Sequence, residues 1–236
     1  MMIGLGQSVW HNAIYDEKTR FLIWDDFNDE RAAGAIDGSP ATPGPSGVVR
    51  NVFDDADGTL TVGSGAFVWQ KWSTVNPWNR WDAPAGTAVP ITRAPGVSVH
   101  FRAKFSSTGN IQFFVNLSSS ATEPSPGDAA ADAQFRGAGP GNQIIFAAAG
   151  AHNALIAGHT FPAVNTFGEY CIVLKAAGVK LYYLSGGVWS ELADWSEGTA
   201  STLYLTWVNH PSAASNGELD SIRVATRPPA GIPMPV

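Results

Sequence analysis

Cysteine, long apolar runs and clusters of like charge are all scarce in this sequence. The only cysteine among 236 residues is Cys171, so the chain can form neither an internal disulfide nor a cysteine zinc cluster. No apolar run reaches the roughly 18 residues of a membrane-spanning helix. Charged residues make up 14% of the chain, the net charge is -6, and lysine and arginine are spread singly. We therefore expect neither nucleic-acid binding nor membrane insertion.

Familiar catalytic and targeting patterns are missing as well. The sequence contains no Gly-x-Ser-x-Gly elbow, no His-Glu-x-x-His pair and no phosphate-binding glycine loop. Residues 1–11 have neither a basic segment nor a continuous apolar segment, so they do not form a Sec signal peptide. The expectation is synthesis in the cytoplasm without Sec-dependent export.

Alternating strand patterns dominate what is present. In residues 97–105, Val97, Val99, Phe101, Ala103 and Phe105 alternate with polar side chains, which predicts a strand with one buried and one wet face. Similar runs occupy residues 111–117, 143–148, 170–175, 179–184, 203–208 and 219–225, with Gly, Pro, Ser and Asn clusters between them. These runs predict one all-β domain, a two-sheet antiparallel sandwich.

Three local features refine this prediction. Residues 179–184 and 188–192 flank Ser185-Gly186-Gly187, which is typical of a hairpin. The alanine-rich residues 128–135 are the best candidate for a short helix. Cys171 lies in a predicted strand, where we interpret it as a small buried hydrophobe, the alternative being a reactive thiol.

Two segments near opposite ends of the chain place aspartate in apolar, strand-like runs. They are residues 21–27, with Asp25 and Asp26, and residues 217–224, with Asp220. A buried carboxylate is costly unless it finds a partner. Because a closed sandwich commonly pairs its first and last strands, we expect these segments to lie side by side.

These bracketing segments resemble those of concanavalin A-like (laminin-G-like) jelly-roll modules. The resemblance rests on Trp24-Asp25-Asp26-Phe27-Asn28, a Gly/Ser/Pro loop at 38–45, Gly58-Thr59-Leu60-Thr61-Val62 and the closing residues 219–224. It implies a jelly roll over residues 21–227, with an arm at residues 1–20 and a proline-rich tail at residues 228–236. Such modules occur in phage tail and virion-surface proteins, in polysaccharide enzymes and as carbohydrate-binding modules.

The resemblance also implies a structural calcium ion where the first and last strands meet. The matching residues are Asp25, Asp26 and Asp220, with Asn28 and Glu218 as weaker candidates. Calcium needs six to eight oxygen ligands, and a carboxylate pair would be a nucleus for them. The alternative is that Asp220 accepts hydrogen bonds from loop amides or pairs with an arginine.

Enzymes of this fold use two catalytic arrangements, and the sequence contains parts of both. Residues 218–223 begin the Glu-x-Asp-x-x-Glu pattern of retaining glucanases, but Arg223 stands where the second glutamate should be, and we expect this segment at a sheet edge. His100 and Arg102 point the same way from one strand and could join Tyr183 as a lyase set. The simpler interpretation is that both lie on a wet face.

The densest unusual feature is a tryptophan-rich segment. Trp69, Trp72, Trp78 and Trp81 are interleaved with polar residues such as Arg80. Indole rings stack on sugars, and Trp and Arg anchor protein interfaces. Glycan contact, a subunit interface and packing in the core or at a sheet edge all remain open.

The sequence therefore favours a non-enzymatic virion component, part of a phage tail or capsid surface. It would assemble with itself or with other virion proteins, adhere to host glycans and lie on the virion surface. The alternative is a carbohydrate-binding module of a larger secreted or surface protein, located outside the cell. A polysaccharide hydrolase or lyase ranks last, because the acid pair is missing.

Overall fold

The structure is a computed structural model whose described part is built from strands. It describes residues 20–27, 38–41, 48–52, 60–63, 66–69, 82–87, 89–105, 112–119, 131–138, 143–148, 152–160, 162–163, 165–210 and 217–235. Within these ranges the regular elements are β1 to β16, all of them strands. The described residues include no helix that is long and apolar enough to cross a membrane.

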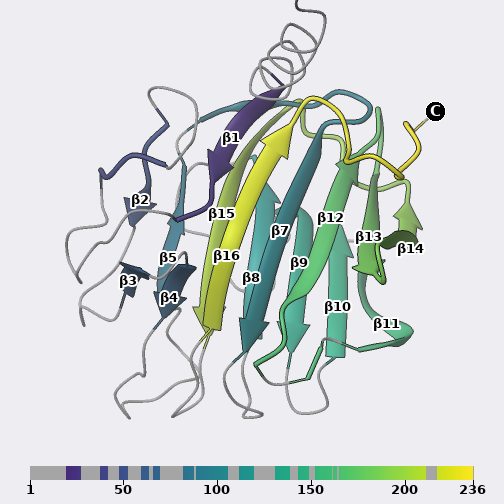
Figure 1. Ribbon diagram of the computed structural model, residues 1–236. Coiled ribbons are helices and arrows are strands. Elements are labelled where there is room, and N and C mark those ends of the chain that lie inside the picture. The colour runs from purple at the N-terminus through teal and green to yellow at the C-terminus, as the bar shows by residue number, and fades with distance from the viewer. Residues whose placement is uncertain are drawn as a thin grey trace, which may run out of the picture.

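The strands form two stacked antiparallel sheets (Figure 1). The front sheet, nearer the viewer, has the order β14 (Val188–Trp195), β13 (Val179–Ser185), β12 (Gly168–Leu174), β7 (Ser98–Phe105), β16 (Gly217–Ala225), β4 (Ala66–Trp69) and β3 (Leu60–Gly63), with β1 (Phe21–Asp25) also pairing with β16. The back sheet has the order β11 (His152–Thr160), β10 (Gln143–Ala148), β9 (Ala131–Ala138), β8 (Gln112–Ser118), β15 (Thr202–His210), β5 (Asp82–Gly86) and β2 (Asn51–Val52), with β6 (Ile91–Thr92) pairing with β15. This arrangement confirms the predicted all-β sandwich.

The core lies between the two sheets. Strand β7 contributes Val99 and Phe101, both fully buried, and β15 contributes Leu205 and Trp207. Successive strand residues point to opposite faces, so the residues between these core positions form the outer faces of the sheets. Any exposed binding site on the described strands must therefore use one of these two outer faces.

The first and last strands pair as expected. In register, Phe21 stands opposite Ala225 and Trp24 opposite Arg223. Strand β16 has β7 along one side, and β4 and then β1 along the other. The expectation that residues 218–223 lie at a sheet edge is therefore wrong, because β16 is an interior strand.

Of the other three local predictions, two are confirmed and one is wrong. The hairpin is confirmed, with Gly186 and Gly187 at positive φ between β13 and β14. The helix at 128–135 is wrong for its described part, since residues from Ala131 onward form β9. Cys171 is fully buried, which confirms the interpretation as a buried hydrophobe, and burial raises the pKa of its thiol.

The chain after β16 folds back onto the outer face of the front sheet. Ile232 is buried against Cys171, Val173 and Tyr182, and Trp189 packs at the same place. The proline-rich tail thus covers the β12 and β13 side of this face (Figure 1). Of the predicted arm, only Arg20 lies within the described residues.

Candidate functional site

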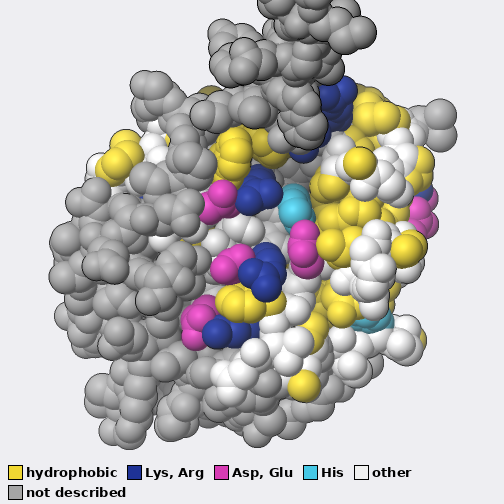
Figure 2. Space-filling model, viewed as in Figure 1, with side chains coloured by type: hydrophobic (Ala, Val, Ile, Leu, Met, Phe, Trp, Pro, Cys, Tyr) yellow, Lys and Arg dark blue, Asp and Glu magenta, His cyan; other side chains and the backbone are white. Residues whose placement is uncertain are grey.

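The outer face of the front sheet carries a ladder of ion pairs. Three basic side chains project from β7, and each contacts a carboxylate of a neighbouring strand. The pairs are His100 Nε2 with Glu169 Oε1 at 2.7 Å, Arg102 Nη1 with Asp220 Oδ2 at 2.6 Å, and Lys104 Nζ with Glu218 Oε2 at 2.9 Å. Figure 2 shows the acidic and basic side chains alternating along a hollow of this face.

The ladder continues to β1 through a fourth pair. Arg223 donates to Asp26 Oδ1 from Nε at 3.1 Å and from Nη2 at 2.8 Å. The Trp24 indole donates to Asp26 Oδ2 at 2.7 Å, and the Arg223 guanidinium also lies over the Trp24 ring. Asp26 is thereby fixed by two donors.

Asp25 points inward and has a different partner. Arg50 donates to both of its carboxylate oxygens, from Nε to Oδ2 at 2.6 Å and from Nη2 to Oδ1 at 2.8 Å. The Phe27 backbone N–H donates to Oδ1 at 2.9 Å, closing a turn in which Phe27 has φ of 50°. Asp25 is 1% exposed and Arg50 is fully buried. The cost of burying this carboxylate is therefore offset by an arginine that the sequence analysis did not single out.

These contacts do not fit a calcium site made from the three aspartates. Each of Asp25, Asp26 and Asp220 accepts hydrogen bonds from a different arginine, so their oxygens do not converge on one point. The described residues contain no group of three or more His, Cys, Asp or Glu that could hold a metal. The alternative interpretation of Asp220, pairing with an arginine, is the arrangement that the structure has. The predicted calcium ion is untested, and a chelation experiment can check it.

The structure does not assemble the lyase set either. His100 and Arg102 share the outer face, as expected, but Tyr183 packs against the core on the opposite face. The hydrogen bond from His100 and the nearby charges lower the pKa of Glu169. An anionic Glu169 suits an ion pair better than a general acid, which must hold a proton.

Most of the tryptophan-rich segment lies outside the described residues, including Trp72, Trp78, Arg80 and Trp81. The backbone of Trp69 ends β4, where it stands opposite Leu60 and Gly217. The predicted glycan or interface contacts of this segment stay predictions.

The outer face of the back sheet is built differently. Its register aligns one residue from each of seven strands in a row, which we call the amide row: Asn153, Ala147, Gln134, Asn116, Thr206, Gly86 and Asn51. With neighbouring strands about 4.8 Å apart, the row is roughly 29 Å long. It is long enough to meet several units of an extended polymer.

Strand alternation places the middle of the amide row on the outer face. Gln134 lies between the core residues Ala133 and Phe135, and Asn116 and Thr206 have equivalent positions on their strands. The three side chains are only 1–2% exposed although they point outward. They therefore form the floor of this face, and partly exposed side chains two residues away, Tyr204 and Arg136, flank them.

Hydrogen bonding within this floor is incomplete. Arg136 Nη2 donates to Gln134 Oε1 at 3.1 Å. Asn116 Oδ1 and Thr206 Oγ1, however, have no hydrogen-bond partner among the residues that the structure describes. A buried polar atom without a partner costs about 1–3 kcal/mol. Such atoms are suited to a ligand that brings hydroxyl groups.

Glycine stands on β5, the sixth strand of the row, where the neighbouring strand leaves no room for a side chain. A Cβ at Gly86 would come within 2.4 Å of the Leu205 carbonyl oxygen and 3.0 Å of Thr206 Cγ2. Only glycine fits there, and its place in the row removes a side chain beside Thr206. Sequence reasoning missed the row because its members come from different strands. The one local signal was a polar residue such as Asn116 within an apolar run.

Comparison with known proteins supports the fold. No model of a protein family matches the sequence, and no curated protein sequence matches it. Among solved structures, one that is similar is a variant of LamA from Zobellia galactanivorans in complex with laminaritriose and laminaritetraose. The two structures match with a TM-score of 0.56 at 12% sequence identity, and the match covers 88% of this chain and 99% of that one. A non-specific endo-β-1,3(4)-glucanase from family GH16 gives 0.55 at 13% identity over 89% of this chain and 91% of that one.

A third similar structure is described as an immunostimulatory antigen and pseudo β-1,3-glucanase of Mycobacterium tuberculosis. Its TM-score is 0.55 at 12% identity, covering 87% of this chain and 98% of that one. The prediction of a non-enzymatic virion component is wrong, because the similar structures include glucanases of family GH16 and none is described as a virion protein. The chain has the concanavalin A-like jelly-roll fold of these proteins, as the bracketing segments indicated.

Proposed function

We propose that this protein acts on a β-linked glucan, which it binds along the amide row of the back sheet. The observation that carries the proposal is the pair of buried oxygens of Asn116 and Thr206, which have no partner among the described residues, on a sandwich that glucanases share. Sugar hydroxyls can donate to these oxygens. The amide row is also free of charge, which suits a neutral polysaccharide.

Aromatic surface beside the row supports the same ligand class. Tyr204 lies two residues before Thr206 on the same face and is partly exposed. Tyrosine combines an apolar ring, on which the C–H side of a sugar packs, with a hydroxyl that forms hydrogen bonds. A glucan chain following the row would meet Tyr204 on one side and Arg136 on the other.

The test is gel retardation and calorimetry with laminarin and with mixed-linkage β-1,3(4)-glucan. We expect Tyr204→Ala and Thr206→Val each to weaken glucan binding about tenfold, because each removes a contact worth 1–2 kcal/mol. The matched control is Lys104→Gln on the front sheet, which should bind as the wild type does. Absence of binding by the wild type, or equal losses in the control, would overturn the proposal.

Hydrolysis of the bound glucan is the second candidate, favoured by the glucanases among the similar structures. That chemistry needs two carboxyl groups on one face, about 5–5.5 Å apart in retaining enzymes. Asp132, two residues before Gln134, accepts hydrogen bonds from Arg93 and from the Ala200 backbone N–H, and Arg93 also donates to the carbonyls of Lys175 and Gly178. Asp132 is thus tied to the turn between β12 and β13 of the opposite sheet. Release of reducing ends from laminarin would establish hydrolysis; binding without release would eliminate it and leave the glucan proposal standing.

A further inference from the structure

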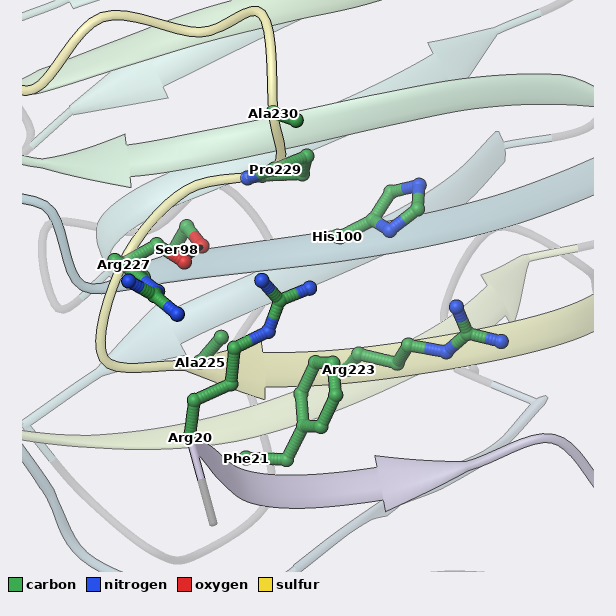
Figure 3. Close-up of a pocket in the computed structure, with 9 residues that line it drawn as sticks. All are labelled: Arg20, Phe21, Ser98, His100, Arg223, Ala225, Arg227, Pro229 and Ala230. Carbon is green, nitrogen blue, oxygen red and sulfur yellow. Dashed lines mark hydrogen bonds between the residues drawn. The ribbon is translucent and has the colours of Figure 1, made fainter. Parts of the chain in front are cut away.

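The proline-rich tail crosses the outer face of the front sheet, and we call its residues 228–235 the strap. Ser98 Oγ donates to the Arg227 carbonyl at 3.2 Å, which fixes the turn between β16 and the strap. Figure 3 shows Ser98 pointing toward this turn, with Pro229 and Ala230 following it across the strands. The strap therefore begins at a fixed point of the sheet.

Beyond this turn the strap is anchored by one buried side chain. Ile232 is 7% exposed and packs on Cys171, Val173 and Tyr182 of β12 and β13. These three side chains belong to a cluster separate from the core between the sheets. The strap thus closes over an apolar patch on the outside of the sandwich.

Two glycines allow the strap to lie close to the sheet. A Cβ at Gly96 would come within 2.4 Å of Met234 Cε, so only glycine leaves room for that methionine. Gly231 has φ of 93°, and its Cβ position is 3.4 Å from Trp189 Cδ1. The fit is close on both sides of Ile232, although Met234 itself is 57% exposed.

Hydrogen bonds contribute little to the hold of the strap. Among the residues that the structure describes, its one hydrogen bond is internal, from the Ile232 N–H to the Pro229 carbonyl at 3.2 Å. Half of its eight residues are prolines, which have no N–H to donate to a strand: Pro228, Pro229, Pro233 and Pro235. A segment with few buried contacts and no backbone bonds to its neighbours opens at a lower free energy than the sheet itself.

We propose that the strap opens and closes over Cys171 while the sandwich stays folded, and that a disulfide formed at Cys171 holds it open. Tyr170 and Ile172 belong to the core, so Cys171 between them faces outward. It is nevertheless fully buried, because the strap and Trp189 cover it. Burial raises the pKa of the thiol and keeps it protonated. Since the thiolate is the reactive form, Cys171 reacts only while the strap is open.

The covalent step is an exchange with a low-molecular-weight disulfide such as oxidised glutathione. Cys171 loses its proton to solvent and its thiolate attacks one sulfur of the disulfide, whose S–S bond breaks. One half stays on Cys171, which is oxidised, and the other half leaves as a thiolate, which is reduced. The added group fills the space of the Ile232 side chain, so the strap cannot close until a thiol reverses the exchange. The strap lies on the front sheet, and the proposal does not depend on the glucan function.

The test is the rate at which the full chain reacts with 5,5′-dithiobis(2-nitrobenzoate) in buffer without denaturant. Because Cys171 is the only cysteine, the signal reports one thiol. We expect the wild type to react at least about 100-fold more slowly than the urea-unfolded chain, since the strap is closed most of the time. Ile232→Ser should react about tenfold faster than the wild type, because it loses the buried anchor. Val188→Ser, at an apolar position that is 66% exposed, is the matched control and should react as the wild type does.

A core variant distinguishes strap opening from unfolding of the sandwich. Val99 is fully buried between the sheets, so Val99→Ala lowers the free energy of unfolding and leaves the strap intact. We expect it to react as the wild type does, and Ile232→Val to show a smaller acceleration than Ile232→Ser. The proposal is overturned if Val99→Ala accelerates the reaction as much as Ile232→Ser, or if neither the wild type nor Ile232→Ser reacts in buffer.

Hydrogen exchange tests whether the disulfide holds the strap open. Glutathione bound to Cys171 should speed exchange of the Ile232 amide about tenfold, and dithiothreitol should restore the slow rate. Cys171→Ala, treated in the same way, should keep its slow rate throughout. An unchanged rate in the glutathione adduct would show that the strap closes over the modified cysteine, which overturns this half of the proposal.

Discussion

The two outer faces of this sandwich use polar side chains in opposite ways. On the front sheet each basic side chain of the ladder contacts a carboxylate, as Arg102 contacts Asp220 and Lys104 contacts Glu218. On the back sheet the amide row is uncharged, and Asn116 and Thr206 keep oxygens without a partner. The side chains of the ladder satisfy one another, whereas the two row oxygens have no partner among the described residues. A face with many paired charges can therefore offer fewer hydrogen-bonding groups to a neutral ligand than a face without charge.

The largest effect is expected where an ion pair is fully buried. Arg50→Met leaves Asp25 as a buried charge without its main partner, and we expect a loss of about 3–5 kcal/mol in the free energy of unfolding. Urea denaturation measures this loss. The double variant with Asp25→Leu removes the orphaned charge and should recover a substantial part of it. A loss below about 1 kcal/mol in the single variant would show that this pair behaves like a surface pair.

In the amide row, a substitution is expected to increase the free energy of unfolding and not to decrease it. Because Thr206 Oγ1 has no partner, Thr206→Val removes an unsatisfied polar atom at nearly constant volume. We expect the free energy of unfolding to rise by up to about 1 kcal/mol. Thr202→Val, at an exposed position of the same strand, is the control and should change stability by less than about 0.5 kcal/mol. A clear destabilisation by Thr206→Val would mean that its hydroxyl does have a partner.

Breaking an ion pair of the front-sheet ladder is expected to cause only a small loss of stability. Arg102→Gln breaks a pair whose two side chains are 42% and 30% exposed, so the loss should not exceed about 1 kcal/mol. High salt should shrink the difference between variant and wild type, because it screens exposed charges. A large loss that persists in high salt would contradict the contrast between exposed and buried pairs.

The change in folding stability with pH that the ladder causes should be smaller than the loss in Arg102→Gln. The hydrogen bond from His100 lowers the pKa of Glu169 below its ordinary value of 4.5, so the folded state favours the ionised form. The stabilisation is therefore complete above that value and is lost as the pH falls through the lowered pKa of the folded state. Glu169→Gln should unfold like the wild type at low pH and be slightly less stable near neutrality. If the stability of Glu169→Gln depends on pH as that of the wild type does, the pair of His100 and Glu169 does not contribute to stability.

No effect is expected from chelation. Since Asp25, Asp26 and Asp220 each contact an arginine, EDTA should leave the melting temperature unchanged. A lower melting temperature in EDTA that calcium alone restores would establish the calcium site instead.

The sequence was sufficient to predict those features that depend on local pattern. Alternation over residues 97–105 located β7, and the Gly186-Gly187 pair located the hairpin. It failed at 131–138 because alanine content suggested a helix. The alternation there, with Ala133 and Phe135 inward and Gln134 and Arg136 outward, is nonetheless a strand pattern.

The candidate sites depend on register between distant strands, which no local pattern encodes. Asn116 and Thr206 are far apart in sequence and meet only because β8 pairs with β15. Arg50 reaches Asp25 from a segment with no strand periodicity of its own.

The position of β16 also constrains the order in which the sandwich can form. As residues 217–225 fill the gap between β7 and the pair β1 and β4, the front sheet stays divided until this segment has been synthesised. Until then the edge of β7 has unpaired backbone groups, which can recruit strands from other chains. Chains that stall or are cut before residue 217 should therefore aggregate.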